Sequence, residues 1–180
     1  MQKPKRIWRA FEAPPGLDRA AADWRRLLGP DYDKVRPYLR AQQGLATSIP
    51  CSARPSCGCY HGVVEHKRDD LVAVCRCEPR RCPTTPIARA DVVVYALHRA
   101  SLGAAIANAL GVKPEDKVLP ELHSTWQVGT YSPRIGTGIP FYLTVQIGPD
   151  ELRAAAEGLV ARIDKPFVLL SPTEVDWKPE

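Results

Sequence analysis

The sequence predicts an α+β fold with an N-terminal helical segment, a cysteine-rich β-hairpin module and a small βαββαβ layer. Apolar residues recur at helical spacing near the N-terminus, six cysteines cluster in the first half, and strand-like and helix-like segments alternate after residue 90. With 44% hydrophobic and 25% charged residues, the 180-residue chain is typical of globular proteins and is not wholly disordered. We expect segment boundaries at 1–48, 49–87 and 88–180.

The N-terminal segment starts with a basic arm and continues as a predicted helical hairpin. Residues 17–28 place their apolar side chains on one helical face, and Gly29 with Pro30 supplies a stop. A second helix is predicted over 31–43, with Pro37 in its first turn or at a kink. The two helices would pack against each other.

The cysteines form two clusters, C-x5-C-x-C and C-x-C-x4-C, on either side of a predicted hairpin with the charged tip KRDD. The candidate metal ligands are Cys51, Cys57, Cys59, Cys75, Cys77 and Cys82. This layout resembles a zinc ribbon, in which two chain turns bring thiolates to one tetrahedral ion. Because thiols stay reduced in the cytoplasm, zinc is favoured over disulfides, an iron–sulfur cluster or inert thiols.

The hairpin register is predicted from the positions of the reactive side chains. A five-residue loop over 66–70 pairs Glu65 with Leu71, whereas a four-residue loop would move the reactive residues to different faces. The five-residue loop gathers four of them on one face: Cys59, His61, Cys75 and Cys77. We expect the opposite face, with Val64, Val72 and Val74, to contact the core.

Six cysteines exceed the needs of one tetrahedral site. The surplus is explained by buried thiols, by His61 replacing one cysteine, or, as a less favoured alternative, by two zinc ions sharing a thiolate. A ribbon this small has little hydrophobic core, so the zinc is expected to be structural and to supply folding free energy.

Charge is distributed unevenly along the chain. Residues 1–99 hold 18 Lys and Arg against 10 Asp and Glu, whereas residues 100–180 hold 7 against 10. A basic half favours a polyanion partner, and a solvated Arg-rich surface is the alternative. The candidate nucleic-acid-binding residues are Arg25, Arg26, Arg54, Lys67, Arg68, Arg76, Arg80 and Arg81.

The C-terminal segment predicts a β-α-β-β-α-β order, which resembles the ferredoxin-like pattern. Its expected elements are a strand at 91–98, a helix at 101–111, strands at 124–131 and 139–147, a helix at 150–163 and a strand at 166–171. Ser101 and Asp150 are the expected helix caps, and Gly111 is the expected stop. Alternatively, Asp91 caps a helix in place of the first strand.

Two weaker sites are candidates in the same segment. The glycine-rich stretch 129–138, with Arg134, Gly136 and Gly138, suggests an anion-binding loop, although a simple turn is favoured. Trp126, with Tyr131 and Tyr142, suggests a surface on which bases stack. The P-loop, nucleophile-elbow and zinc-protease motifs are absent from the sequence.

Together these features predict a zinc-binding, nucleic-acid-associated protein, such as a bacterial DNA-binding regulator or an accessory factor of a mobile or defence system. The alternative is a ligand-sensing or protein-interaction module, with a protein partner or a homo-oligomer, in which zinc is only structural. A zinc- or thiolate-dependent hydrolase ranks last. The chain shows no secretory signal and no apolar run long enough for a membrane span, so we expect a cytoplasmic protein that does not bind membranes.

Overall fold

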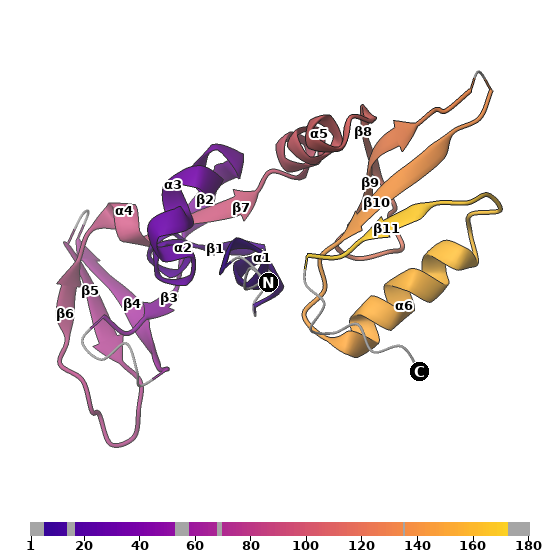
Figure 1. Cartoon of the computed structure of the whole chain (residues 1–180). Helices are drawn as coiled ribbons and strands as arrows, with labels where there is room; N and C mark the ends of the chain where they lie inside the picture. The colour runs from indigo at the N-terminus through magenta and orange to yellow at the C-terminus, as the bar shows by residue number, and fades with distance from the viewer. Residues whose placement is uncertain (1–5, 14–16, 53–57, 68–69, 135, 173–180) are drawn as a thin grey trace. The chain divides into compact units, whose positions relative to one another are not determined.

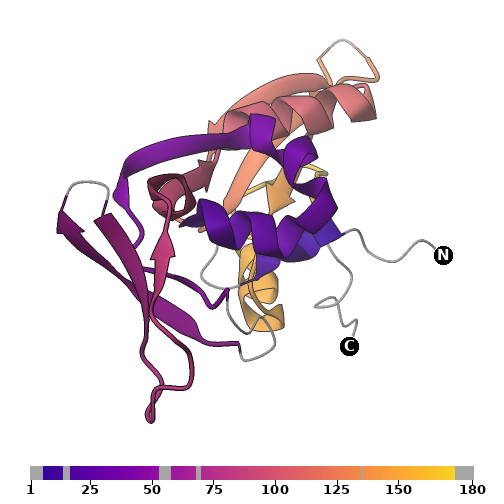
Figure 2. The same cartoon turned by 90° about the vertical axis from the view of Figure 1, so that its left-hand side faces the viewer.

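The structure is a computed structural model, and it describes residues 6–13, 17–52, 58–67, 70–134 and 136–172 (Figures 1 and 2). The chain divides into two compact units, one of residues 17–96 and one of residues 1–16 with 97–180. These boundaries differ from the three predicted segments, whose division at 48 and 87 stays a prediction. Among the described residues, no helix is long and apolar enough to cross a membrane.

The unit of residues 17–96 contains two sheets, ordered β1-β7-β2 and β3-β4-β5-β6. Its strands are β1 (Asp18–Ala20), β2 (Leu39–Leu45), β3 (Ser48–Pro50), β4 (Tyr60–Lys67), β5 (Asp70–Cys75), β6 (Thr85–Ile87) and β7, which runs over Val93–Leu97. Its helical elements are α2 (Ala21–Leu28), η1 (Gly29–Asp31), α3 (Tyr32–Val35), η2 (Arg36–Tyr38) and α4 (Arg89–Val92).

The predicted helical hairpin is wrong in its second half. The first predicted helix, over 17–28, forms only from Ala21 onward, as α2. The residues before it form β1, in which Asp18 pairs with Ala96 of β7. Pro37 lies in the first turn of the short η2, and the chain becomes extended at Leu39, which begins β2 beside β7. Because proline lacks an N–H and favours the first turn of a helix, the sequence breaks into short turns here.

The predicted β4–β5 register is confirmed, with Glu65 opposite Leu71 and His61 opposite Cys75. The predicted loop over 66–70 is too long, because the strands continue past a register shift to pair Lys67 with Asp70. The predicted core face is wrong, because Leu71 and Ala73 are buried on the same face as Cys75, whereas Val64 is 39% exposed. The core cluster on this face consists of Ala20, Ile49, Leu71, Ala73 and Val92. The cysteine face is therefore also the core face.

The second unit contains one sheet, ordered β11-β10-β9-β8. Its elements are α1 (Arg6–Glu12), α5 (Arg99–Leu110), β8 (Lys113–Val118), β9 (Thr125–Tyr131), β10 (Ile139–Thr144), α6 (Pro149–Val160) and β11 (Val168–Leu170). Strands β8, β9 and β10 form an antiparallel meander, and α6 connects β10 to the parallel neighbour β11 (Figure 1).

The predicted ferredoxin-like arrangement is not what forms. The first predicted strand begins as the single turn α4, ends as β7, and pairs with β1 and β2 instead of joining this sheet. The buried Val92 belongs to the core of the other unit, which draws this segment away. The sheet gains β8 instead, an edge strand whose charged, exposed residues give no apolar alternation.

The helix ends of this unit follow local chemistry. Gly111 ends α5 in the left-handed conformation at φ 68°, as predicted. The N-cap of α5 is His98 and not Ser101, because the His98 ring accepts a hydrogen bond from the Ser101 N–H. Helix α6 has Gly148 as its N-cap and begins at Pro149. Asp150, the predicted cap, is therefore the second residue of the helix.

The core of this unit surrounds β9. Trp126 and Val128 have no exposed surface, and Gly103 of α5 lies close to both. Tyr142 is also buried, and of the three aromatic residues only Tyr131 is exposed. The predicted base-stacking surface is therefore wrong, because the strand that carries Trp126 is central in the sheet.

Candidate metal centre

Three neighbouring strands place cysteine and histidine side chains on one face of their sheet. Ile49, His61 and Cys75 stand opposite one another on β3, β4 and β5. Beyond the end of β3, the Cys51 N–H donates to the Cys59 carbonyl over 2.9 Å, which continues the same register. Because side chains two residues apart share a face of a strand, Cys51 and Cys59 follow Ile49 and His61 on that face.

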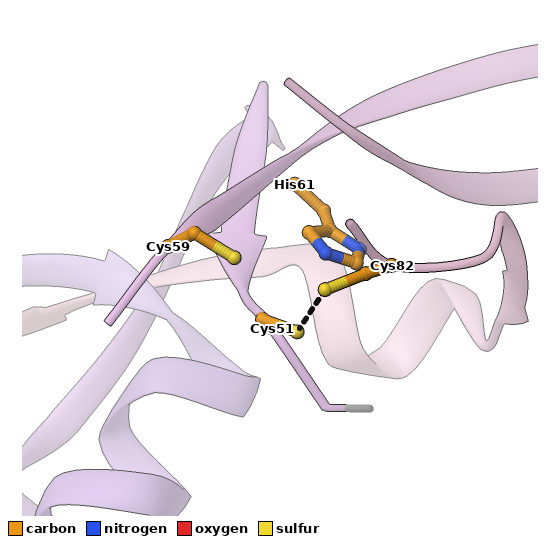
Figure 3. Close-up of side chains that lie close together, drawn as sticks. All are labelled: Cys51, Cys59, His61 and Cys82. Carbon is orange, nitrogen blue, oxygen red and sulfur yellow. Dashed lines mark hydrogen bonds between the residues drawn. The ribbon is translucent and has the colours of Figure 1, made fainter. Parts of the chain in front are cut away.

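Four side chains converge at this place (Figure 3). They are Cys51, Cys59, His61 and Cys82, and one ligand atom from each lies within 4.8 Å of every other. Cys82 comes from the segment between β5 and β6, and its Sγ lies 3.6 Å from the Sγ of Cys51. All of these side chains are buried except Cys59, which is half-buried.

The His61 ring is the strongest sign that this group binds a ligand. The residue is 1% exposed, and neither Nδ1 nor Nε2 has a hydrogen-bond partner among the described residues. Leaving a buried polar atom without a partner costs about 1–3 kcal/mol, so such atoms are rare in folded proteins. A cation bound by one ring nitrogen would remove this cost for that nitrogen, so the residues present fit a metal ion.

A second group shares one cysteine with the first. Its members are Cys59, Cys75 and Cys77, whose sulfurs also lie within 4.8 Å of one another. Backbone N–H groups of Cys77, Arg81 and Cys82 hydrogen-bond the Cys75 sulfur and lower its pKa to about 6. Cys75 is thus prepared to be a thiolate at neutral pH, the form in which cysteine binds metals.

Cys82 has the opposite electrostatic situation. Burial, followed by the hydrogen bond and the negative charge of Cys51, raises the pKa of the Cys82 thiol to about 11. The protein alone therefore does not hold all of these sulfurs as thiolates. A divalent cation among them would compensate the crowded negative charge.

The structure brings five of the six predicted metal ligands together, and Cys57 lies outside the described residues. His61 joins them, although the sequence suggested it only as a substitute for a cysteine. The signal for His61 was its position two residues after Cys59 and opposite Cys75, but its burial depends on the neighbouring strand β3.

The predicted nucleic-acid-binding residues separate into three sets. Arg54 and Arg68 lie outside the described residues. Arg25 and Arg26 are held in ion pairs, Arg25 with Asp91 at 2.6 Å and Arg26 with Asp23 at 2.9 Å. The remaining four are exposed: Lys67, Arg76, Arg80 and Arg81.

The glycine-rich loop between β9 and β10 closes on itself. The Thr137 hydroxyl donates a hydrogen bond to the Arg134 carbonyl over 2.9 Å. Its oxygen accepts a second one from the Arg134 backbone N–H over 3.2 Å. Gly136 has φ 82°, a conformation that favours glycine. Among the described loop residues, Arg134, Gly136 and Gly138 thus belong to a turn whose hydrogen bonds are internal.

Comparisons with protein-family models, with curated proteins and with solved structures find no match for this chain. The candidate metal centre therefore stands on its own geometry.

Proposed function

We propose that residues 17–96 form a nucleic-acid-binding module whose fold depends on a structural zinc ion. The observation that carries the metal is the buried His61 ring, whose two nitrogens find no partner among the described residues and lie among three cysteine sulfurs. The observation that supports the polyanion is the position of three exposed arginines on the segment that would be fixed by the metal.

Zinc is the ion that this donor set suits. Thiolates and imidazole together are typical zinc ligands, and structural zinc sites are closed by four of them. Two sulfurs bound to one zinc at about 2.3 Å are about 3.8 Å apart in a tetrahedron, close to the 3.6 Å between Cys51 and Cys82. His61 and Cys59 complete the four positions, which makes this zinc structural rather than catalytic.

The arginines lie on the chain between Cys75, at the end of β5, and the zinc ligand Cys82. Arg76 is between Cys75 and Cys77, and Arg80 and Arg81 directly precede Cys82. Unlike Arg25 and Arg26, these three form no ion pair with the described carboxylates. Strand β5 holds one end of this segment at Cys75, and a metal bound to Cys82 would fix the other end. The guanidinium groups would then be held ready for phosphate contacts, at a lower entropic cost.

A groove of about 410 Å³ adjoins these arginines. It is lined by Gly62, Val64, Val74, Cys75, Arg76, Cys77, Glu78 and Arg80. The Arg76 guanidinium lies over the backbone of Gly62, at a place where any larger residue would displace it. Arg76 and Arg80 therefore both line this groove, where they would contact the phosphates of a bound nucleic acid.

The test is binding of a fluorescently labelled 20-base-pair DNA duplex to the zinc-loaded protein, followed by anisotropy between 50 and 200 mM salt. We expect affinity to fall with salt, with a log–log slope of about −2.7 for three phosphate contacts. Replacing Arg76, Arg80 and Arg81 with alanine should weaken binding and flatten this slope.

The matched control removes the same charge from the other unit, by replacing the exposed Lys113, Lys117 and Lys165 with alanine. This variant should bind almost as the unchanged protein does. An equal loss in both variants would show a mere net-charge effect, and affinity that does not depend on salt would contradict nucleic-acid binding.

A further inference from the structure

We infer that Cys59, Cys75 and Cys77 hold a second divalent, thiophilic metal ion, which the Cys59 thiolate joins to the first. This inference rests on the proposed zinc site and deepens it, since it assigns the donors that one tetrahedral ion leaves over. The result is a two-metal thiolate centre in place of a single zinc site.

The first argument is the shared sulfur. Cys59 belongs to both groups of close donor atoms, whereas each of the other donors belongs to one group. A thiolate sulfur has enough lone pairs to bind two ions at once, and the Cys59 sulfur lies within 4.8 Å of the donor atoms of both groups. The strand register explains this place, because β4 lies between β3 and β5.

The second argument is the surroundings of Cys75. Its side chain is 2% exposed and belongs to the buried cysteine cluster. Its sulfur lies within 4.8 Å of the sulfurs of Cys59 and Cys77. Cys75 is nevertheless not one of the four donors around His61. Three cysteine sulfurs this close together, two of them outside the first site, match the donor set of a further thiophilic ion.

The two positions would differ in their access to water. Three of the four donors of the first ion are buried, whereas Cys59 and Cys77 of the second group are half-buried. Two tetrahedral ions that share one ligand need seven ligand positions, and the described donors supply six. The described donors thus leave one position of the second ion for water or an added ligand, and this ion should exchange faster than the first.

The test counts metal ions on the full-length protein. After expression with zinc, native mass spectrometry should show two ions per chain, and Cys77→Ser should show one. Thr84→Ala, an exposed change two residues after Cys82, is the matched control and should keep two. One ion in the unchanged protein, lost in His61→Ala and kept in Cys77→Ser, would overturn the second ion and leave the proposed zinc site intact. No bound ion at all would overturn both.

A second measurement does not depend on a variant that folds. The unchanged protein loaded with cadmium-113 should give two cadmium resonances, one for three sulfurs with one nitrogen and one for three sulfurs with an oxygen donor. Scalar coupling between them would report the shared Cys59 sulfur. A single resonance at full loading, or two without coupling, would contradict the bridged centre.

Discussion

The sulfurs of Cys51 and Cys82 lie 3.6 Å apart, although the two residues are 31 positions apart in the chain. A disulfide would need about 2.05 Å, so these are two separate thiols that face each other. They join the end of β3 to the segment before β6, two parts of the sheet that are not neighbours in the strand order. A metal between them would therefore tie together both edges of the sheet.

Removal of the metal should loosen this sheet and leave the other unit protected. Three of the buried residues at this end of the sheet are cysteines, so little apolar core remains there to replace a lost ion. After chelation we expect amide hydrogen exchange in β4 and β5 to accelerate at least about a hundredfold, because structural zinc contributes directly to folding free energy. Exchange in β9 and β10 should be unchanged.

The same loosening should follow from His61→Ala with zinc present. The control is Val64→Ala on the same strand, whose side chain is 39% exposed and lies on the opposite face. Exchange in that variant should match the unchanged protein. Full protection of β4 and β5 after complete metal removal would contradict a structural role.

Asp23 should be the most sensitive polar position of α2. Its carboxylate lies 3.3 Å from Arg19, whose side chain has no exposed surface, and it also contacts Arg26 and the Tyr60 hydroxyl. Breaking a buried pair leaves an uncompensated charge, so Asp23→Ala should lower the free energy of unfolding by about 3–5 kcal/mol. Urea denaturation measures this change.

An exposed ion pair supplies the comparison for Asp23. Lys34 lies 2.7 Å from Asp31, but its side chain is 72% exposed. Lys34→Ala should therefore cost less than about 1 kcal/mol. Similar losses in the two variants would show that burial does not decide the strength of these pairs.

Alkaline pH should weaken the contact between α2 and β4 through Tyr60. Burial, and then the Asp23 carboxylate, raises the pKa of Tyr60 above its ordinary value of 10. Below pH 10 the phenol is neutral in both the folded and the unfolded chain, so the contribution is fully present there. Above pH 10 the unfolded chain ionises first, and stability is lost as the pH rises through the folded pKa.

This dependence is measured by urea denaturation at pH 8 to 11. Tyr60→Phe should be less stable at pH 8, because it loses the hydrogen bond to Asp23. Its stability should also fall less between pH 9 and 11 than that of the unchanged protein. An identical decline in both proteins would assign the alkaline loss to other groups.

Local chemistry accounts for the parts of the fold that the sequence predicted. The β4–β5 register follows from a polar tip and alternating side chains, and Gly111 ends α5 because glycine adopts positive φ without strain. The failures have tertiary causes. The second half of the helix predicted over 31–43 forms β2 instead and pairs with β7, and β8 is an edge strand without an apolar pattern.

The candidate site was predictable in composition but not in its surroundings. Cysteine spacing indicated metal ligands, and the hairpin register placed Cys59 near Cys75 and Cys77. The role of His61 depends on β3, which covers it and brings Cys51 beside it, and no local pattern around 61 shows that neighbour. The ion pairs of Arg25 and Arg26 are likewise visible only when α2 has packed.

Gly129 should be the glycine of β9 that tolerates no side chain. A Cβ there would lie 2.7 Å from the Val112 side chain and 2.8 Å from the Lys113 carbonyl, and backbone cannot move aside as a flexible side chain can. Gly129→Ala should therefore lower the free energy of unfolding by about 1–3 kcal/mol, as overpacking commonly does. Gly138→Ala, whose new Cβ would meet only the Thr130 methyl at 3.1 Å, should cost less. Urea denaturation of both variants decides the order, and an equal or reversed cost would mean that β8 and β9 are not packed as closely as the structure places them.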